Sequence, residues 1–441
     1  SLLVKSLKDI TPQAREINKT ACLASATIAV PMRQEPAPFL IGERLNTQGS
    51  RRFKELIIKE DYEAILDIAR SQIDNGAHGL DVCVALTERS DEVETMQKVV
   101  KSLAPVIQAP FIIDTTEPDV LEAALQSAPG KCLINSTNFE NGRAKADLIF
   151  SLARKYNAAV MVLTIDENGM AKTPEEKLRI ARKGFEIAVK DHGIPPGDLV
   201  FDALTFTLAT GDPEYADSAR HTLDGIKLIK TNLPGVMTSL GVSNVSFGLS
   251  QNARSVINSV MLYHAVQAGL DMAIVNPAHI KPYAEITEVE KSLAEDLLFN
   301  KTPDALHKLI SYFAEHKGDE SVEKVDQQLH NLPIDERIQY RIVQRKKDGI
   351  EQDIDVMIDD RGDLSRHERA VQILNSVLLP AMKTVGDKFG SGELILPFVL
   401  QSAEVMKRAV THLEKYLEKQ EGVSKGKVVI ATVYGDVHDI G

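Results

Sequence analysis

The feature that most constrains this chain is a regular alternation of short apolar runs and amphipathic stretches of helical period, which begins at Phe39. The predicted strands are Phe39–Glu43, Gly79–Val84, Phe111–Thr115, Cys132–Ser136, Ala158–Thr164, Leu199–Leu204, Val236–Val242 and Met272–Asn276. Eight strand–helix units over about 250 residues match the number and size of a (β/α)8 barrel, the TIM barrel of the α/β class. A doubly wound open sheet is the alternative, although eight repeats favour closure.

The same patterning divides the 441-residue chain into segments. Residues 1–37 contain one helical stretch followed by prolines, and we predict a lead-in linker there. The barrel is predicted over residues 38–318, and the polar residues 319–332 are predicted to form a second linker. Residues 333–425 have a helical pattern throughout, as in a small antiparallel bundle. At residues 426–441 an apolar strand and a loop are predicted to begin a Rossmann-like domain that the sequence does not complete.

Polar side chains occupy or closely follow the carboxyl ends of six predicted strands. They are Glu43, Asp81, Asp114, Asn135, Asp202 and Asn244. Any one of them alone is explained as a strand-end cap or a turn-forming residue. Six on one barrel rim indicate a polar ligand, because a buried polar group left unpaired costs about 1–3 kcal/mol. Carboxylates and amides without a matching basic cluster favour a ring with N–H donors, and a reduced pterin fits that description.

Four motifs at these strand ends resemble those of the pterin-binding family, which includes dihydropteroate synthases and methyltetrahydrofolate methyltransferases. They are Gly42-Glu43-Arg44-Leu45-Asn46, Ile113-Asp114, Ile134-Asn135-Ser136 and Gly241-Val242-Ser243-Asn244-Val245-Ser246. The first and the last together are similar to the methyltransferase branch. The resemblance implies that folate contacts Glu43, Asn46, Gly49, Ser50, Asp81, Asp114, Asn135, Asp202, Asn244 and Arg254.

The same resemblance implies the catalytic roles. The N5 atom of 5-methyltetrahydrofolate is a poor leaving group unless it is protonated or strongly hydrogen-bonded in the transition state. Asn244, with Asp114 or an ordered water, is the expected source of that assistance. Where many relatives carry an Asp-x-Asn sequence, this chain has Cys83, which we interpret as a packed strand residue and not as a nucleophile.

The predicted helical bundle contains the sequences Val-Gly-Asp-x-Phe-Gly and Leu-Pro-x-Val-Leu near Phe389 and Leu396. This stretch resembles the helical cap over the upper face of cobalamin in cobalamin-dependent methionine synthases and related corrinoid proteins. The resemblance implies that Phe389, Leu396 and Val399 shield the axial methyl group from water. Asn375 stands where relatives often have a glutamate that faces the corrin.

The last residues of the chain follow an apolar run that is typical of a buried parallel strand. They are Gly435, Asp436, Val437, His438, Asp439, Ile440 and Gly441. A carboxylate two residues before an imidazole can fix the ring for metal binding, although a polar loop is the alternative. The stretch resembles the Asp-x-His-x-x-Gly motif of cobalamin-binding domains, and so implies that Gly435–Asp439 and Gly441 contact the cofactor and that His438 is the axial cobalt ligand.

Composition excludes several other classes. The net charge of −12 argues against nucleic-acid or anionic-membrane partners, and no apolar run approaches the roughly 20 residues that span a bilayer. The three cysteines, Cys22, Cys83 and Cys132, lie far apart, so neither a disulfide framework nor a thiolate zinc site is expected. We therefore expect a reducing, cytoplasmic location.

The combined resemblances imply methyl transfer from 5-methyltetrahydrofolate to cob(I)alamin, as one part of methionine synthesis from homocysteine through methylcobalamin. The implied partners are a homocysteine-binding domain or subunit, where zinc would bind, and a reactivation domain or reductase. The alternatives are a methyltransferase that acts on a corrinoid iron–sulfur protein, a dihydropteroate synthase, and a non-catalytic corrinoid carrier.

Overall fold

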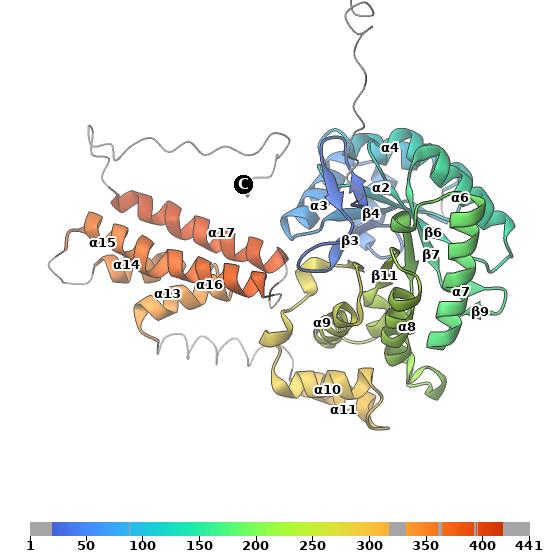
Figure 1. Ribbon diagram of the computed structural model, residues 1–441. Coiled ribbons are helices and arrows are strands. Elements are labelled where there is room, and N and C mark those ends of the chain that lie inside the picture. The colour runs from blue at the N-terminus through green and yellow to red at the C-terminus, as the bar shows by residue number, and fades with distance from the viewer. Residues whose placement is uncertain are drawn as a thin grey trace, which may run out of the picture.

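A closed barrel of parallel strands and a separate helical bundle make up the computed structural model, which describes residues 20–87, 89–316, 332–359, 364–391, Leu394 and residues 396–417 (Figure 1). In sequence order the barrel strands are β3 (Phe39–Asn46), β4 (Gly79–Cys83), β5 (Phe111–Asp114), β6 (Leu133–Thr137), β7 (Ala159–Leu163), β10 (Leu199–Asp202), β11 (Met237–Gly241) and β12 (Met272–Val275). Because β12 pairs with β3, the sheet has no free edge. The predicted (β/α)8 barrel is confirmed, and the open doubly wound sheet is wrong.

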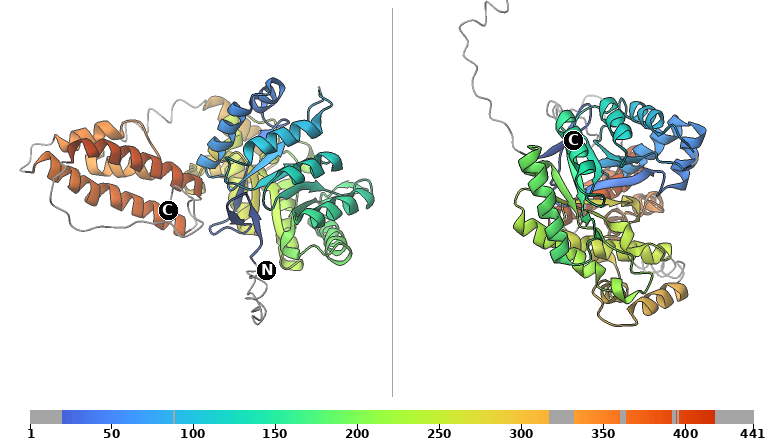
Figure 2. Two further views of the ribbon diagram at one scale, coloured as in Figure 1. Left: turned by 90° about the horizontal axis from the view of Figure 1, so that it is seen from above. Right: turned by 90° about the vertical axis from the view of Figure 1, so that its right-hand side faces the viewer.

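Helices cover the outside of the barrel (Figure 2). They are α2 (Arg51–Lys59), α3 (Tyr62–Asp74), α4 (Glu92–Leu103), α5 (Pro118–Ser127), α6 (Ala144–Tyr156), α7 (Pro174–Glu186), α8 (Ser218–Asn232), α9 (Gln251–Ala268), α10 (Glu288–Leu298) and α11 (Ala305–Glu315). The local sequence determines where α7 begins. Thr173 and Glu176 form a reciprocal capping box there, and the first helical residue is Pro174. The helices α3 to α9 pack around the strands, whereas α10 and α11 pack mainly on α8 and α9.

A short hairpin closes the amino-terminal end of the barrel. Strands β1 (Cys22–Ala24) and β2 (Ala29–Pro31) pair antiparallel, and Leu23 and Met32 are buried in the cluster of inward-facing strand residues that includes Phe39. The segment predicted as a lead-in linker therefore contributes residues 22–32 to the barrel core. Two strands of three residues are too short for the alternation that reveals longer strands.

The bundle consists of five helices among the described residues. They are α13 (Ile334–Val343), α14 (Ile350–Ile358), α15 (Arg366–Ile373), α16 (Leu379–Gly390) and α17 (Leu396–Leu413). Isoleucines such as Ile338, Ile354 and Ile373 fill its own core. A π-helical turn, Leu374–Leu378, joins α15 to α16 just before Pro380, so the chain accommodates the missing N–H of proline without ending the helix.

The bundle contacts the barrel beside α9 and α3. Val385, Leu394 and Phe398 are buried in the same apolar cluster as the residues of α9, and the Arg345 guanidinium lies 5.2 Å from the centre of the Phe398 ring. Arg345 also forms an ion pair with Glu285 of the barrel. The end of the bundle that carries the α16–α17 connection is thus the end that is docked.

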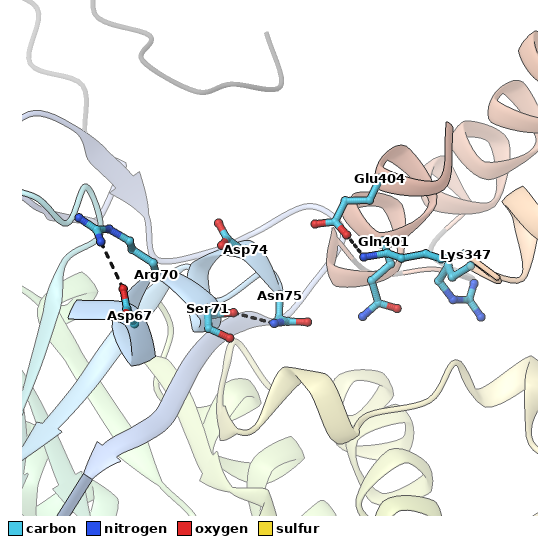
Figure 3. Close-up of a pocket in the computed structure, with 9 residues that line it drawn as sticks. Asp67, Arg70, Ser71, Asp74, Asn75, Lys347, Gln401 and Glu404 are labelled. Carbon is cyan, nitrogen blue, oxygen red and sulfur yellow. Dashed lines mark hydrogen bonds and ion pairs between the residues drawn. The ribbon is translucent and has the colours of Figure 1, made fainter. Parts of the chain in front are cut away.

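Next to this contact lies a charged cleft of about 600 Å³ between α3 and the bundle (Figure 3). On the barrel side Arg70 pairs with Asp67 at 3.4 Å, and on the bundle side Lys347 pairs with Glu404. Among the described residues that line the cleft, each of these ion pairs stays within its own domain. Separation of the two domains at the cleft would therefore leave both ion pairs intact.

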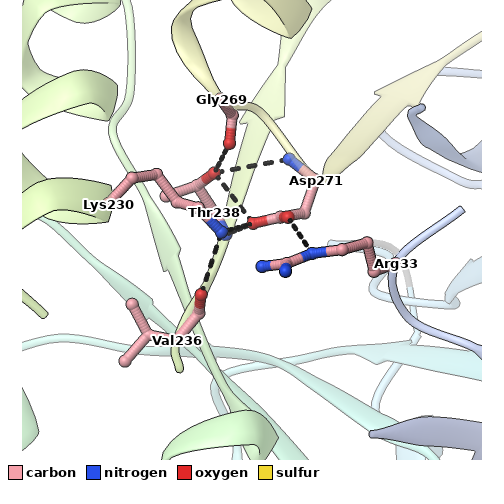
Figure 4. Close-up of polar contacts among 6 residues, drawn as sticks. All are labelled: Arg33, Lys230, Val236, Thr238, Gly269 and Asp271. Atoms are coloured by element: carbon pink, nitrogen blue, oxygen red, sulfur yellow. Dashed lines mark hydrogen bonds and ion pairs between the residues drawn. The ribbon is translucent and has the colours of Figure 1, made fainter. Parts of the chain in front are cut away.

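A buried carboxylate ties several elements together where the barrel closes (Figure 4). Asp271, just before β12, accepts hydrogen bonds from Lys230 Nζ at 2.6 Å and from the Thr238 backbone N–H at 2.8 Å. Its other oxygen lies 3.3 Å from Arg33 Nε, and its own carbonyl accepts from the Phe39 N–H at 2.7 Å. One side chain thus connects α8, β11 and the segment that leads into β3.

Asp271→Ala should lower the free energy of unfolding by about 3 kcal/mol, because it leaves the Thr238 N–H and a largely buried ammonium group without their partner. Urea denaturation followed by circular dichroism measures the effect. Glu186→Ala, which breaks an exposed pair with Lys190, is the matched control and should cost less than about 1 kcal/mol. Equal losses for both variants would contradict the assignment.

Candidate functional site

Four of the predicted site residues form one hydrogen-bonded cluster at the carboxyl ends of β3 to β6. The Asn46 amide donates to Asp81 Oδ2 at 3.0 Å and to Asp114 Oδ2 at 2.7 Å. Asn135 donates to the other oxygen of Asp81 at 3.1 Å. The expected convergence of these strand ends is therefore observed.

An irregularity in β3 makes this arrangement possible. In a regular strand, residues three apart face opposite sides of the sheet. The register of β3 against β4 shifts between Gly42 and Leu45, so Glu43 and Asn46 both reach polar partners at the barrel mouth. The strand was predicted to end at Glu43, but it continues to Asn46, because a bulge leaves no trace in the apolar pattern.

The carboxyl groups of this cluster hold protons more tightly than exposed ones. Burial raises the pKa of Asp81 to about 6, although the amides of Asn46 and Asn135 oppose the shift. Burial, and then the charge of Asp81, also raises the pKa of Asp114 well above its usual value. Burial thus favours the protonated form of both carboxyl groups, and the hydrogen bonds from the two asparagine amides favour the ionised form of Asp81.

Asp202, at the end of β10, is held in a separate arrangement. Its Oδ1 accepts from the Leu204 N–H at 2.7 Å, and Leu204 adopts a φ of 53°, a conformation that costs a branched residue energy. The Leu204 carbonyl accepts in turn from Thr222 Oγ1 at 2.7 Å. Burial raises the pKa of Asp202 to about 6, while the nearby charge of Lys177 acts in the opposite direction.

Lys177 was not predicted, yet it supports the loop behind Asp202. Its side chain is 1% exposed, and its Nζ donates to the carbonyls of Ala171 at 3.0 Å, Ala203 at 2.6 Å and Leu204 at 3.2 Å. Burial lowers the pKa of its ammonium group to about 8. A lysine in an amphipathic helix normally faces water, so only the contacts reveal this role.

On the opposite side of the mouth, Glu43 accepts a hydrogen bond from Ser243 Oγ at 3.2 Å. Burial raises the pKa of Glu43, and this hydrogen bond and the charges of Arg44 and Arg254 oppose the shift. Ser243 belongs to the Gly241–Ser246 motif, from which the sequence analysis predicted a role for Asn244 only. The sequence did not predict a partner for Ser243. Only closure of the barrel brings Ser243 next to the first strand.

Asn244 lies in the 3-10 helix Val242–Ser246 that follows β11, and its side chain is exposed. Arg254, in the first turn of α9, donates to Ser246 Oγ at 3.3 Å, and Ser246 donates to Asn258 Oδ1 at 2.7 Å. This chain of bonds fixes the base of Arg254 at the rim. The structure thus brings the predicted residues of β11 and α9 to the same mouth.

Two predicted residues belong to the turn after β3. The N–H groups of Gly49 and Ser50 donate to the Asn46 carbonyl at 3.2 and 2.8 Å. Ser50 is buried, and its hydroxyl caps α2 by accepting from the Phe53 N–H. The Ser50 side chain is therefore used to cap the helix, and a folate contact for Gly49 and Ser50 stays a prediction.

Cys83 on β4 is buried, and burial is the main reason why its pKa is raised to about 12, which agrees with a packed and unreactive thiol.

The predicted cap residues differ in their exposure. Asn375 is exposed in the π-helical turn, with exposed Val371 and Leu379 four residues before and after it. Phe389 and Val399 are half-buried, and Val399 packs against the cluster shared with the barrel. A corrin contact for Asn375, Phe389 and Val399 stays a prediction.

Some predicted residues are not covered. The side chain of Leu396 and residues Gly435, Asp436, Val437, His438, Asp439 and Gly441 lie outside the described part of the chain. Within the part that is described, no group of three or more histidine, cysteine or acidic side chains could hold a metal ion. No helix in those same segments is long and apolar enough to cross a membrane.

Comparison with known sequences finds two family profiles on this chain. Residues 42–276 match the family described as "Pterin binding enzyme", and residues 334–414 match the one described as "B12 binding domain". The first match begins in β3 and ends directly after β12, and the second spans α13 to α17.

Two curated proteins are similar over almost the whole chain. The methionine synthase of Mycobacterium leprae (strain TN) is 40% identical over 438 residues, which are 97% of this chain and 36% of that protein. The methionine synthase of Mycobacterium tuberculosis (strain ATCC 25618 / H37Rv) is 40% identical over 443 residues, 99% of this chain and 36% of the relative. This chain thus spans about a third of their length.

Among solved structures, a Yersinia pestis DHPS with a pterine-sulfa conjugate aligns with a TM-score of 0.42 and 15% sequence identity, covering 64% of this chain and 98% of that one.

The raised pKa of Asp202 predicts a measurable pH effect. Folding favours its protonated form, so this stabilisation is complete below about pH 4 and is lost as the pH rises through about 6. Asp202→Asn cannot ionise, and should gain about 3 kcal/mol of stability relative to the unmodified chain between about pH 4 and pH 7. Urea titrations across this range measure the gain. Asp74→Asn, at an exposed carboxylate, is the control; a pH-independent difference for Asp202→Asn would refute the prediction.

Proposed function

This chain belongs to the pterin binding enzyme family, and from that premise we propose that its barrel binds 5-methyltetrahydrofolate and transfers the N5 methyl group to cobalamin. The observation that carries the proposal is the presence of both matches on one chain, a pterin-binding barrel followed by a B12 binding domain. The predictions of a pterin-binding barrel and of a helical B12 domain are both confirmed. The reaction step and the site residues are our proposal.

The polar rim supplies the complement to a pterin ring. In this proposal Asp114, Asn135 and Asp202 bind its donor-rich edge, while Asn46 and Asp81 hold Asp114 and Asn135 in position through the hydrogen bonds described above. A ring N–H that donates to a buried carboxylate replaces the water lost on binding. The cluster is rigid because each of its amides is already paired.

The proposed chemistry requires assistance at N5. Methyl transfer leaves an amine nitrogen with developing negative charge unless a donor reaches it. Asn244 lies at the rim with an exposed amide, and among the described residues no hydrogen-bond partner occupies it. The raised pKa of Asp114 supports a proton held within the same mouth. We therefore assign Asn244 the direct contact with N5, assisted by Asp114 or by an ordered water.

The bundle would cover the cofactor. Reduced cobalamin supplies the nucleophile that accepts the methyl group. In this proposal Asn375, Phe389, Leu396 and Val399 face the corrin and exclude water from its upper side. In the same proposal His438 would ligate the cobalt and Asp436 would orient its ring. These two residues, with Gly435, Val437, Asp439 and Gly441, lie outside the described part of the chain.

The complete proposed activity is methionine synthesis from homocysteine, which needs parts beyond the matched region. We propose a homocysteine-binding domain or subunit, with its own zinc, and a reactivation domain or reductase as partners. A methyltransferase for a separate corrinoid protein is the runner-up, and the B12 domain match on this same chain argues against it. A carrier without catalysis is disfavoured by the intact polar rim.

Methyl transfer from 5-methyltetrahydrofolate to added cob(I)alamin tests the proposal directly, with the cobalt absorption spectrum as the readout. Asn244→Ala should lower the rate at least about 100-fold while folate still binds, because a lost transition-state donor costs about 3 kcal/mol. The nearby exposed Asn252→Ala is the matched control and should retain the rate. Full activity in Asn244→Ala would refute its role, and absence of folate binding would refute the barrel assignment.

A further inference from the structure

Three arginines lie beside the proposed folate site, and only Arg254 among them has a side-chain hydrogen bond described above, to Ser246. They are Arg254 on α9, Arg44 on β3 and Arg52 on α2. None of these three guanidinium groups forms an ion pair with a described carboxylate, whereas their neighbour Arg51 pairs with Glu55 at 2.9 Å. In a chain with a net charge of −12, three unpaired cations on one side of the mouth indicate an anionic ligand.

The arginines line two adjoining pockets. The first, of about 100 Å³, reaches from Glu43 at the barrel mouth to Arg254 and His279. The second, of about 250 Å³, lies between the start of α2 and α3 and includes Arg52. Arg44 and Asn276 line both pockets, so the two adjoin each other, and we call the pair of pockets the groove.

The local potential in this groove is positive. The pKa of His279 is lowered, first by burial and then by the charges of Arg44 and Arg254. Two carboxylates also line these pockets: Glu43, whose pKa is raised mainly by burial, and Asp67, which is already paired with Arg70. The groove therefore repels further cations and favours carboxylates.

Helix electrostatics point in the same direction. Arg52 lies in the first turn of α2 and Arg254 in the first turn of α9, and neither turn contains an acidic residue. A cation at a helix amino terminus opposes the helix dipole and costs about 0.3–1 kcal/mol. Residues that break a local stability rule without a compensating contact are expected at functional sites. A bound anion would reverse this cost.

We propose that this groove, from Arg254 through Arg44 to Arg52, binds the γ-linked glutamate tail of the folate. The inference rests on the proposed function, because it needs the pterin ring to occupy the barrel. Arg254 is nearest the mouth and would meet the first glutamate, whereas Arg44 and Arg52 would meet the later ones. Recognition of the tail thus depends on ion pairs with its carboxylates, so folates with different numbers of glutamates can bind in the same groove.

The test compares 5-methyltetrahydrofolate monoglutamate with its triglutamate on the 441-residue chain, by titration calorimetry at low ionic strength. Exposed charge pairs contribute about 0.2–1 kcal/mol each, so we expect the triglutamate to bind about 5–20-fold more tightly. Arg52→Gln and Arg44→Gln should each lower this ratio about 2–5-fold, and the double variant should bring it close to one. High salt should have the same effect as the double variant.

Arg51→Gln is the matched control. It removes the same charge from the adjacent position of α2, but its side chain is 92% exposed and already paired with Glu55, so the ratio should stay within about 2-fold. An equal loss in Arg51→Gln would mean that only the general charge of α2 matters, and would overturn the proposed groove.

Two outcomes separate this inference from the proposed function. If the monoglutamate binds and the triglutamate gains nothing, or keeps its gain in the double variant, the groove assignment is wrong and the barrel assignment stands. If neither folate binds, both proposals are wrong.

Discussion

The pairing of β12 with β3 is the contact on which the rest of the site depends. It brings Glu43, on the first strand, beside Ser243, which follows the seventh strand, although 200 residues separate them in sequence. The same closure is anchored at the amino-terminal end by Asp271, whose carboxylate reaches β11 and α8. A barrel stabilised at one end can hold a strained and polar arrangement at the other.

Burial of these polar groups lowers the stability of the fold, and this loss indicates that a ligand binds there. Asp81 and Asp202 are almost fully buried, and burial is the main reason why their pKa values rise. The cluster around Asp81 contains amides as its hydrogen-bond donors and no cation, so its charge is only partly compensated. A protein designed only for stability would place aliphatic residues here. A ligand that donates N–H groups to these carboxylates would remove much of the penalty.

The sequence was sufficient to predict the features that recur along the chain, namely the strand–helix units and the polar residues at the strand ends. Alternating apolar and amphipathic segments predicted the barrel, and polar residues after the strands predicted the cluster at Asn46, Asp81, Asp114 and Asn135, because parallel strands end on one rim. Family resemblance added the ligand, which no pattern of polarity could identify by itself. The boundary of β3 was wrong because a bulge does not alter the order of apolar residues.

What the sequence did not reveal depends on long-range contacts. The helical pattern of α7 predicts an exposed Lys177, but the fold places three carbonyls around its Nζ. Gly225 on α8 leaves the space that this side chain needs, because a Cβ there would lie 2.7 Å from Lys177 Cδ. Likewise, the sequence analysis found no basic cluster to match the acidic rim. Arg44, Arg52 and Arg254 form one only because β3, α2 and α9 meet around the closed barrel.

The position of the bundle adds a constraint on how the proposed reaction proceeds. Val399 is predicted to face the corrin, but here it packs against the cluster that joins Phe398 and Leu394 to α9. One side chain cannot fill both places, so a bundle that covers cobalamin through Val399 has to leave this contact. The neighbouring cleft favours such a movement, since the pairs of Arg70 with Asp67 and of Lys347 with Glu404 do not cross it. Release of the bundle therefore breaks the apolar contact and the Arg345–Glu285 pair, among the contacts described here.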